Sequence, residues 1–313
     1  MKSEQLGFLF PGQGSQKVGM LAEIAAQHCA IKDTFDEASE TLGYDVWALV
    51  QGGPQDALNL TERTQPMLLT AGVALWRLWL AQGGPEPALL AGHSLGEFTA
   101  LVCAQSIEFS DAVSLVRQRG EFMQAAVPVG VGAMAAIIGL DDDAINQACT
   151  ESAEGEVVAA VNFNSPGQVV IAGHADAVAR ASERCLAAGA KRALPLPVSA
   201  PFHTALMQPA GESLKDVLAG ITVREPVIPV VHNVHADTLS DPDAIKDMLV
   251  AQIYSPVQWV ACVRTMQQRG ITRMLECGPG KVLAGLCRRI DRTLQAGALE
   301  QPSGFEQALR SFD

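Results

Sequence analysis

The sequence lacks closely spaced cysteines, although it contains seven cysteines in 313 residues. No CxxC pair occurs and the count is odd, so neither a disulfide framework nor a zinc ribbon is predicted. Scattered single thiols are typical of proteins kept in a reducing compartment. We therefore expect a cytoplasmic protein that holds no metal ion and uses no other cofactor.

Long hydrophobic runs are also missing. The longest apolar stretch, residues 67–80, is interrupted by Arg77 and falls short of the roughly 20 residues of a membrane span, so it predicts a buried helix. The first residues lead into the short apolar run 6–10 without the cleavage pattern of a signal peptide, and we expect no leader. The sequence therefore gives no reason to expect a membrane partner.

Positive charge is scarce, because 22 Lys and Arg residues stand against 34 Asp and Glu, which gives a formal net charge of −12. Nucleic-acid binding needs a basic surface that neutralises phosphates, so this class of function is not expected. The apolar fraction of 48% and the charged fraction of 18% are those of an ordinary globular protein. A chain of this length can bury one large core with a smaller one inserted.

The first 130 residues alternate between strand and helix patterns. Residues 6–10 and 87–92 are short apolar runs typical of buried strands, and each leads into a glycine-containing loop. The predicted helices cover residues 17–29, 31–42, 65–82, 97–105 and 111–127. This alternation is typical of a parallel α/β sheet.

The middle third of the sequence has a different rhythm. It predicts strands at 132–139, 157–163, 168–172 and 191–197, with helices at 141–152 and 176–188. The order β-α-β-β-α-β is that of a ferredoxin-like unit. We therefore predict a small subdomain at residues 130–198, inserted into an α/β body that is formed by residues 1–129 and 199–313.

The last third returns to the α/β pattern. We expect helices at 204–219, 242–253 and 256–269, strands at 227–231 and 271–276, and a final helix that begins at Gly278-Pro279-Gly280 and ends at residue 289.

The segment Gly92-His93-Ser94-Leu95-Gly96 fits the pattern G-x-S-x-G and lies between a predicted strand and a predicted helix, as a nucleophile elbow requires. A strained turn lifts the serine hydroxyl out of the sheet, and small flanking residues let the chain reverse without a Cβ clash. The following helix N-terminus offers free N–H groups to an oxyanion, that of Leu95 first. Ser94 is therefore the predicted nucleophile, and a chance pentapeptide in a glycine-containing turn is the alternative.

A serine nucleophile needs a base, and His203 is the best placed of the six histidines. It follows the predicted strand end at 198–202, at the edge where ligands bind in open α/β sheets. The positive end of the helix that His203 opens would keep the ring neutral and able to accept the serine proton. A helix-capping role is the alternative. His93 is expected to pack against the elbow, while His232 and His235 lack an obvious third metal ligand and are expected to be structural.

Arg119 lies on the apolar face of the predicted helix 111–127. It is three residues after Val116 and four before Met123, whereas Arg117 lies on the polar face. A buried guanidinium must find an anion, because an unpaired buried charge costs several kcal/mol. The anion can be a carboxylate of the protein or of a substrate, and the sequence leaves both open. A planar bidentate fork suits a substrate carboxylate well.

Five motifs occur in an order that resembles one family. They are Phe10-Pro11-Gly12-Gln13-Gly14-Ser15-Gln16, Gly92-His93-Ser94-Leu95-Gly96-Glu97, Arg117-Gln118-Arg119-Gly120, Asn162-Phe163-Asn164-Ser165-Pro166-Gly167-Gln168 and Pro201-Phe202-His203. With Gly278-Pro279-Gly280, the ordered matches extend from residue 8 to about 286, and they closely resemble the malonyl-CoA:acyl-carrier-protein transacylases. The resemblance implies an α/β fold in which an α/β-hydrolase-like parallel-sheet body carries an inserted ferredoxin-like small subdomain. This agrees with the pattern of strands and helices.

The resemblance also implies the catalytic roles of matching residues. Ser94 would be the nucleophile and His203 its base. Gln13 and Leu95 would donate backbone N–H groups to the oxyanion. In the family a backbone carbonyl rather than an aspartate orients the histidine, and Gln252 matches the residue that supplies it.

Further residues are expected at the substrate. The resemblance implies that Arg119 binds the malonyl carboxylate and that Gln65 lies near the site. Phe202 precedes the base, as is common in malonyl-selective relatives. We predict Met123, on the same helix face as Arg119, as a further substrate-binding residue.

The implied reaction is ping-pong transfer of a malonyl group from malonyl-CoA to the phosphopantetheine thiol of acyl carrier protein, through a malonyl-serine, for fatty-acid synthesis. A methylmalonyl or polyketide acyltransferase, or one associated with malonate decarboxylation, stays open. A serine thioesterase is less favoured, because the acids between Ser94 and His203, Asp111 and Asp141 to Asp143, lie at predicted helix starts and are explained by capping. A carrier-binding module without chemistry is a further alternative.

We expect a monomer whose acidic carrier protein would dock on basic side chains, against the overall negative field. A solvated helix face is the alternative for the cluster at 288–292. The candidates are Lys191, Arg192, Lys281, Arg288, Arg289 and Arg292.

Overall fold

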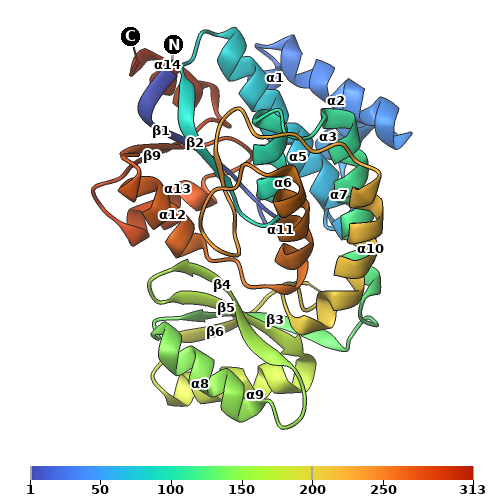
Figure 1. Cartoon of the computed structure of the whole chain (residues 1–313), viewed down its shortest axis with the longest axis vertical. Helices are drawn as coiled ribbons and strands as arrows, with labels where there is room; N and C mark the ends of the chain where they lie inside the picture. The colour runs from blue at the N-terminus through green and yellow to red at the C-terminus, as the bar shows by residue number, and fades with distance from the viewer. Residues whose placement is uncertain (1, 199, 313) are drawn as a thin grey trace.

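The computed structural model describes residues 2–198 and 200–312, and its strands form two separate sheets (Figure 1). The first sheet is parallel throughout, with the strand order β7-β2-β1-β8-β9. Its strands are β1 (Lys2–Phe10), β2 (Glu86–Gly92), β7 (Val230–Val231), β8 (Arg273–Glu276) and β9 (Gln295–Ala298). This sheet and the helices around it are called the body below.

The body buries both faces of its sheet, as apolar strands in parallel sheets generally do. Along β1 the side chains of Phe8 and Phe10 enter one apolar core, while Leu9 enters a second core on the opposite face. The first core is covered by α1 (Ala22–Ala25), α2 (Cys29–Leu42), α3 (Val46–Gly52), α4 (Gln55–Leu58), α5 (Thr61–Ala81), α6 (Leu95–Cys103), α7 (Phe109–Ala125), α10 (Gln208–Ala219), α11 (Pro242–Tyr254) and α14 (Pro302–Arg310). The second is covered by α12 (Trp259–Gln268) and α13 (Val282–Ile290).

The second sheet is antiparallel, with the strand order β4-β5-β3-β6, and lies at one end of the molecule in Figure 1. Its elements are β3 (Gly132–Ile138), α8 (Asp142–Ser152), β4 (Val158–Ser165), β5 (Gln168–His174), α9 (Ala175–Ala187) and β6 (Arg192–Pro195). One face packs on α8 and α9 around Ile137 and Ile171, and the other contributes Met134 and Val170 to the first core of the body. These elements are called the small subdomain, and their β-α-β-β-α-β order confirms the predicted fold class.

The predicted limits of the small subdomain, residues 130 and 198, stay a proposal for where the chain divides. The first limit falls between α7 and β3, and the second falls after β6. Ser199, where the second body segment was predicted to begin, lies outside the described residues.

Several predicted elements differ from those observed. The predicted helix 17–29 is wrong except for α1 and the start of α2, because Gly14 and Gly19 take positive φ values and turns fill the segment before residue 22. The helix predicted at 204–219 begins at Gln208, after the 3-10 turn η1 (Ala205–Met207). The helix predicted as the last one is followed by β9 and α14.

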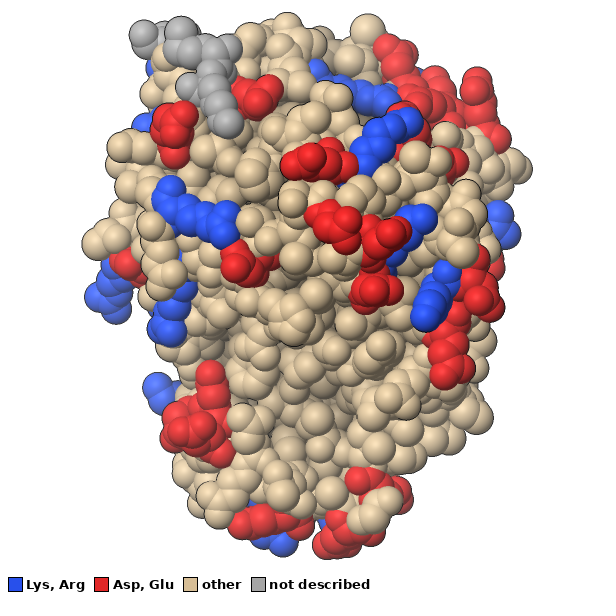
Figure 2. Space-filling model, in the orientation of Figure 1, with Lys and Arg blue, Asp and Glu red and all other residues tan. Residues whose placement is uncertain are grey.

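Charged side chains are scattered over the outer parts of the face in Figure 2, whereas its middle, where the body meets the small subdomain, carries few of them. Within residues 2–198 and 200–312, no helix combines the length and apolar character that crossing a bilayer requires.

Candidate active site

Ser94 lies in the sharp turn between β2 and α6 and is the N-cap residue of α6. Its backbone has φ 51° and ψ −105°, a conformation that a residue with a Cβ adopts only under constraint. Asn233 supplies that constraint from a distant part of the chain. Its Oδ1 accepts the Ser94 N–H at 2.7 Å, and its Nδ2 donates to the Gly92 carbonyl at 2.7 Å.

The glycines on either side of Ser94 are required by close backbone packing. A Cβ on Gly92 would lie 1.8 Å from the carbonyl carbon of Gly96, and a Cβ on Gly96 would lie 2.0 Å from the carbonyl oxygen of Phe10. Both distances are far below van der Waals contact, and the opposing atoms are backbone atoms. The turn can therefore form only with glycine at these two positions, as the sequence motif predicts.

The substitution Gly92→Ala is expected to lower the free energy of unfolding by about 3 kcal/mol or more, because the backbone must move to admit a methyl group. Gly285→Ala in α13 is the matched control: nothing lies within 4 Å of the added Cβ, so a change within about 1 kcal/mol is expected. Urea denaturation of the three proteins measures the difference. A Gly92→Ala protein as stable as the wild type would contradict this account of the turn.

His203 lies beside the serine hydroxyl. Its Nε2 is 2.9 Å from Ser94 Oγ, and its Nδ1 is 2.8 Å from the backbone carbonyl oxygen of Gln252. A carbonyl only accepts, so Nδ1 carries the proton and Nε2 is free to accept the serine proton. The orienting partner is a backbone carbonyl and not a carboxylate, unlike the Ser-Asp-His order of the thioesterase alternative.

The neutral state of His203 has two causes beyond the predicted one. Burial and, second to it, the positive charge of Arg119 together lower the pKa of His203 to about 3. The predicted contribution of the helix N-terminus stays a prediction: His203 precedes the 3-10 turn η1, which leads directly into α10 at Gln208. The desolvated pocket and the neighbouring guanidinium keep the imidazole unprotonated at neutral pH.

Arg119 is fully buried and points at the same serine. Its Nη2 donates to Ser94 Oγ at 3.1 Å and to Gln252 Oε1 at 2.9 Å, and its Nη1 donates to Gln65 Oε1 at 2.7 Å. Its Nε has no hydrogen-bond partner among the described residues. Burial lowers the pKa of Arg119 to about 10, so the guanidinium stays charged at neutral pH.

No carboxylate of the described chain forms an ion pair with this guanidinium, whereas Arg117 on the surface pairs with Glu121 at 3.0 Å. The sequence left open whether Arg119 binds a carboxylate of the protein or of a substrate. A direct ion pair with a carboxylate of the described chain is not observed. The unpartnered Nε and the Nη2 that touches Ser94 lie on the same edge of the planar guanidinium. That edge can accept a carboxylate in a bidentate manner.

Two of the other predicted substrate-binding residues, Gln65 and Met123, are connected to Arg119. Gln65 is buried and its Nε2 is 3.9 Å from the Met123 sulfur, so both side chains sit beside Arg119. Phe202 is buried next to His203 in the chain.

The two predicted oxyanion donors come from adjacent loops. Leu95 is the first residue of α6, and Gln13 lies in the loop that follows β1. Neither backbone N–H has an acceptor within the described chain. The loops are in contact, because a Cβ on Gly12 would lie 2.5 Å from the carbonyl oxygen of His93. A free N–H group directly after a serine nucleophile, such as that of Leu95, is suited to stabilising an oxyanion, and the role of Gln13 stays a prediction.

The sequence analysis missed two residues that hold the site, Glu97 and Asn233. Glu97 is the single charged residue of the apolar helix α6, so the argument applied to Arg119 would have found it. Asn233 lies just after β7, at the carboxyl end of a parallel strand, where site residues gather.

His93 and His232 have structural contacts. His93 Nε2 is 2.8 Å from Asn164 Oδ1, and its ring packs on Trp259. His232 Nδ1 is 2.8 Å from Glu97 Oε1. Across the described part of the chain, no three His, Cys, Asp or Glu side chains are grouped so as to bind a metal ion.

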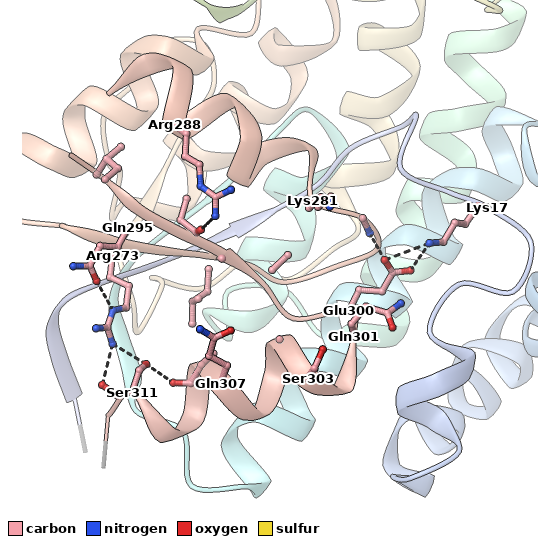
Figure 3. Close-up of a pocket in the computed structure, with 18 residues that line it drawn as sticks. Lys17, Arg273, Lys281, Arg288, Gln295, Glu300, Gln301, Ser303, Gln307 and Ser311 are labelled. Atoms are coloured by element: carbon pink, nitrogen blue, oxygen red, sulfur yellow. Dashed lines mark hydrogen bonds and ion pairs between the residues drawn. The ribbon is translucent and has the colours of Figure 1, made fainter. Parts of the chain in front are cut away.

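A pocket of about 780 Å³ lies elsewhere, between α13, β9 and α14 (Figure 3). None of the predicted site residues lines it, although Lys281 and Arg288, two of the carrier-docking candidates, do. Its polar groups bind one another: Lys17 forms an ion pair with Glu300 at 3.2 Å, and the Gly280 N–H donates to the same carboxylate at 3.0 Å. The docking prediction for these cations stays a prediction.

Comparison with known proteins matches residues 7–295 to the acyl transferase domain family. A malonyl CoA-acyl carrier protein transacylase of Escherichia coli (strain K12) is 60% identical over 305 residues, which cover 97% of this chain and 99% of that protein. The transacylase of Bacillus subtilis (strain 168) is 45% identical over 98% of this chain and 97% of that protein.

Solved structures show the same fold. A malonyl-CoA:acyl carrier protein transacylase from Xanthomonas oryzae pv. oryzae aligns with a TM-score of 0.98 at 53% identity, covering 99% of both chains. A malonyl-transacylase in complex with its type II polyketide-synthase acyl-carrier protein aligns with a TM-score of 0.97 at 53% identity, covering 98% of this chain and 99% of that one.

Proposed function

We propose that this chain, which belongs to the acyl transferase domain family and, within it, to the malonyl-CoA:acyl-carrier-protein transacylases, carries the malonyl group on Ser94. The enzyme moves a malonyl group from malonyl-CoA to the phosphopantetheine thiol of an acyl carrier protein and so supplies extender units for fatty-acid synthesis. One observation carries the proposed site: a buried Arg119 without an acid partner faces the same hydroxyl that His203 contacts.

In the first half-reaction, Ser94 Oγ attacks the thioester carbonyl of malonyl-CoA while His203 Nε2 takes the hydroxyl proton. The Gln252 carbonyl holds the Nδ1–H of the ring, so the lone pair of Nε2 stays directed at Ser94. The tetrahedral intermediate collapses with cleavage of the C–S bond, and the coenzyme A thiolate leaves with the proton from His203. The product is a malonyl ester of Ser94.

The charge that develops on the thioester oxygen is met by the N–H groups of Gln13 and Leu95. Such donors act where water is excluded, and removing one typically costs about 3 kcal/mol of transition-state stabilisation. The N-terminus of α6 lies behind Leu95 and adds its dipole in the favourable sense. The turn that strains Ser94 therefore also presents one of the donors.

In the second half-reaction the phosphopantetheine thiol of the carrier protein takes the place of coenzyme A. His203 removes the thiol proton, the thiolate attacks the malonyl ester, and Ser94 leaves with the proton. Donor and product are both thioesters, so we expect the overall transfer to be freely reversible.

The malonyl carboxylate would bind the edge of Arg119 formed by Nε and Nη2. A desolvated, bidentate pair between this guanidinium and a carboxylate discriminates strongly against an acyl group that ends in a methyl, because such a group would leave the guanidinium unpaired. Gln65 and Met123 would pack along the same end, and Phe202 would limit its size near the base.

Incubation with malonyl-CoA in the absence of carrier protein is expected to add one malonyl group to the chain. Intact-protein mass spectrometry followed by peptide mapping should place the group on Ser94, and addition of phosphopantetheinylated carrier protein should remove it and load the carrier. Rapid hydrolysis with no loading would instead support the thioesterase alternative. A protein that binds the carrier without becoming acylated would support the binding module.

The monomeric state and the cytoplasmic location expected from the sequence remain proposals, which sedimentation equilibrium and cell fractionation would test. Six of the seven cysteines are buried and all seven are free, which is compatible with a reducing compartment.

A further inference from the structure

Glu97 is a fully buried carboxylate. Its hydrogen-bond partners do not include Ser94 or Arg119, the residues proposed to hold the malonyl group. Its Oε1 faces His232 Nδ1 at 2.8 Å, and its Oε2 accepts from the Asn233 backbone N–H and from Gln252 Nε2, both at 2.9 Å. Oε2 thus accepts two hydrogen bonds, and donors of this kind stabilise a carboxylate in its ionised form. A buried charge with several such donors is costly to disturb.

The side-chain amide of Gln252 lies between this anion and the cation of the site. Its Nε2 donates to Glu97 Oε2 and to the Ser94 carbonyl at 3.0 Å, while its Oε1 accepts from Arg119 Nη2 at 2.9 Å. A flipped amide would turn Nε2 toward the guanidinium and Oε1 toward the carboxylate, which makes both contacts repulsive. Glu97 and Arg119 thus fix one orientation of the amide.

The same glutamine also orients the base, because its backbone carbonyl accepts the Nδ1–H of His203. Asn233, which binds the Gly92 carbonyl and the Ser94 N–H, is anchored through its own N–H to Glu97. The Glu97 carboxylate therefore binds two positioning residues directly. Gln252 positions His203 and Arg119, and Asn233 positions the strained turn at Ser94. Its negative charge also stabilises the charged form of Arg119, opposing the loss caused by burial.

We propose that Glu97 is a positioning residue for acyl selection, which acts through Gln252 to hold Arg119 and His203 on Ser94. The proposal rests on the proposed function of this site. It assigns Glu97 no contact with the substrate. The malonyl preference is therefore set partly by a residue that malonyl-CoA does not reach.

The test compares kcat/KM for malonyl-CoA and for acetyl-CoA in Glu97→Ala. Without its anchor the Gln252 amide can rotate, and Arg119 loses its fixed direction. We expect malonyl kcat/KM to fall about 100-fold, the size of effect caused by small misplacement of reacting groups. Because acetyl transfer does not use Arg119, the ratio of malonyl to acetyl kcat/KM is expected to fall at least about tenfold. A merely structural residue would lower both substrates alike.

His232→Ala is the matched control. It removes the partner of Glu97 Oε1 from the same buried region but leaves the contact between Oε2 and Gln252, so it should lower stability and keep the malonyl-to-acetyl ratio. If Glu97→Ala does not fold, Glu97→Asp answers the same question, since its shorter carboxylate keeps the charge but cannot reach Gln252 and its other partners together. It is expected to lower the ratio in the same direction.

The outcomes separate the two proposals. A wild-type protein that is not acylated on Ser94 by malonyl-CoA refutes the proposed function. A wild type that is acylated, together with a folded Glu97 variant whose malonyl-to-acetyl ratio stays within about threefold of it, refutes only the positioning role. An equal loss for both substrates also refutes it.

Discussion

Replacing either Ser94 or His203 with alanine is expected to lower kcat for malonyl transfer by at least about 10⁴-fold, and the double variant should be no slower than the slower single variant. The two side chains act on one proton in one step, since Nε2 lies 2.9 Å from the hydroxyl. Once either is gone, the other has nothing to act on. Stopped-flow or quenched-flow measurement of carrier loading in the three variants gives the rates.

The matched control is His235→Ala, because His235 is an exposed histidine on the loop after β7. Its kcat should equal that of the wild type. Independent losses that multiply in the double variant would show that Ser94 and His203 do not form one catalytic unit. Substantial malonyl loading by Ser94→Ala would locate the acyl group elsewhere.

The parts of the site that could be predicted are those that violate a local pattern. Arg119 stands on an apolar helix face, and Ser94 stands between small residues at a strand-to-helix turn. Each conflict with ordinary packing is visible in the sequence because it needs only a few neighbouring residues to define it. The structure then places the two side chains 3.1 Å apart.

What could not be predicted depends on contacts between distant segments. The Ser94 backbone is held by Asn233, 139 residues later, and Gln252 reaches Glu97 across 155 residues. No local periodicity records such pairs. The partner of the His203 ring was suggested only by the family resemblance, since any backbone carbonyl looks the same in a sequence.

Some element boundaries were also predicted wrongly, because they too depend on tertiary packing. The segment after β1 contains enough helix-forming residues to predict a helix at 17–29, but Gly14 and Gly19 take positive φ values that a helix does not allow. Gly12 packs its backbone against the carbonyl of His93 in the elbow. The last strand, β9, is only four residues long and contains glycine, so its pairing with β8 comes from tertiary packing rather than from strand propensity. The predicted helices that face the core, such as α2, α8 and α9, were placed within one or two residues.

Arg119→Ala is expected to reverse the choice between malonyl and acetyl groups. Malonyl kcat/KM should fall about 1,000-fold, which corresponds to about 4 kcal/mol, because a desolvated charge pair is lost and the carboxylate is left unpaired. Acetyl kcat/KM should fall by less than about tenfold or rise. The variant removes a positive charge that lowers the pKa of His203, and the base becomes easier to protonate in the transition state.

Arg117→Ala is the control for this substitution, because it removes an arginine from the same helix without touching the site. Arg117 forms a surface pair with Glu121, and such a pair contributes only about 0.3 to 0.5 kcal/mol, so both substrates should react as in the wild type. The buried position adds a second expectation: Arg119→Ala leaves the side-chain oxygens of Gln65 and Gln252 without their donor inside the protein and should be less stable by about 1 to 3 kcal/mol. An Arg119→Ala enzyme that folds and still prefers malonyl-CoA would show that some other group recognises the carboxylate, and the edge of Arg119 beside Ser94 would then have no role in selection.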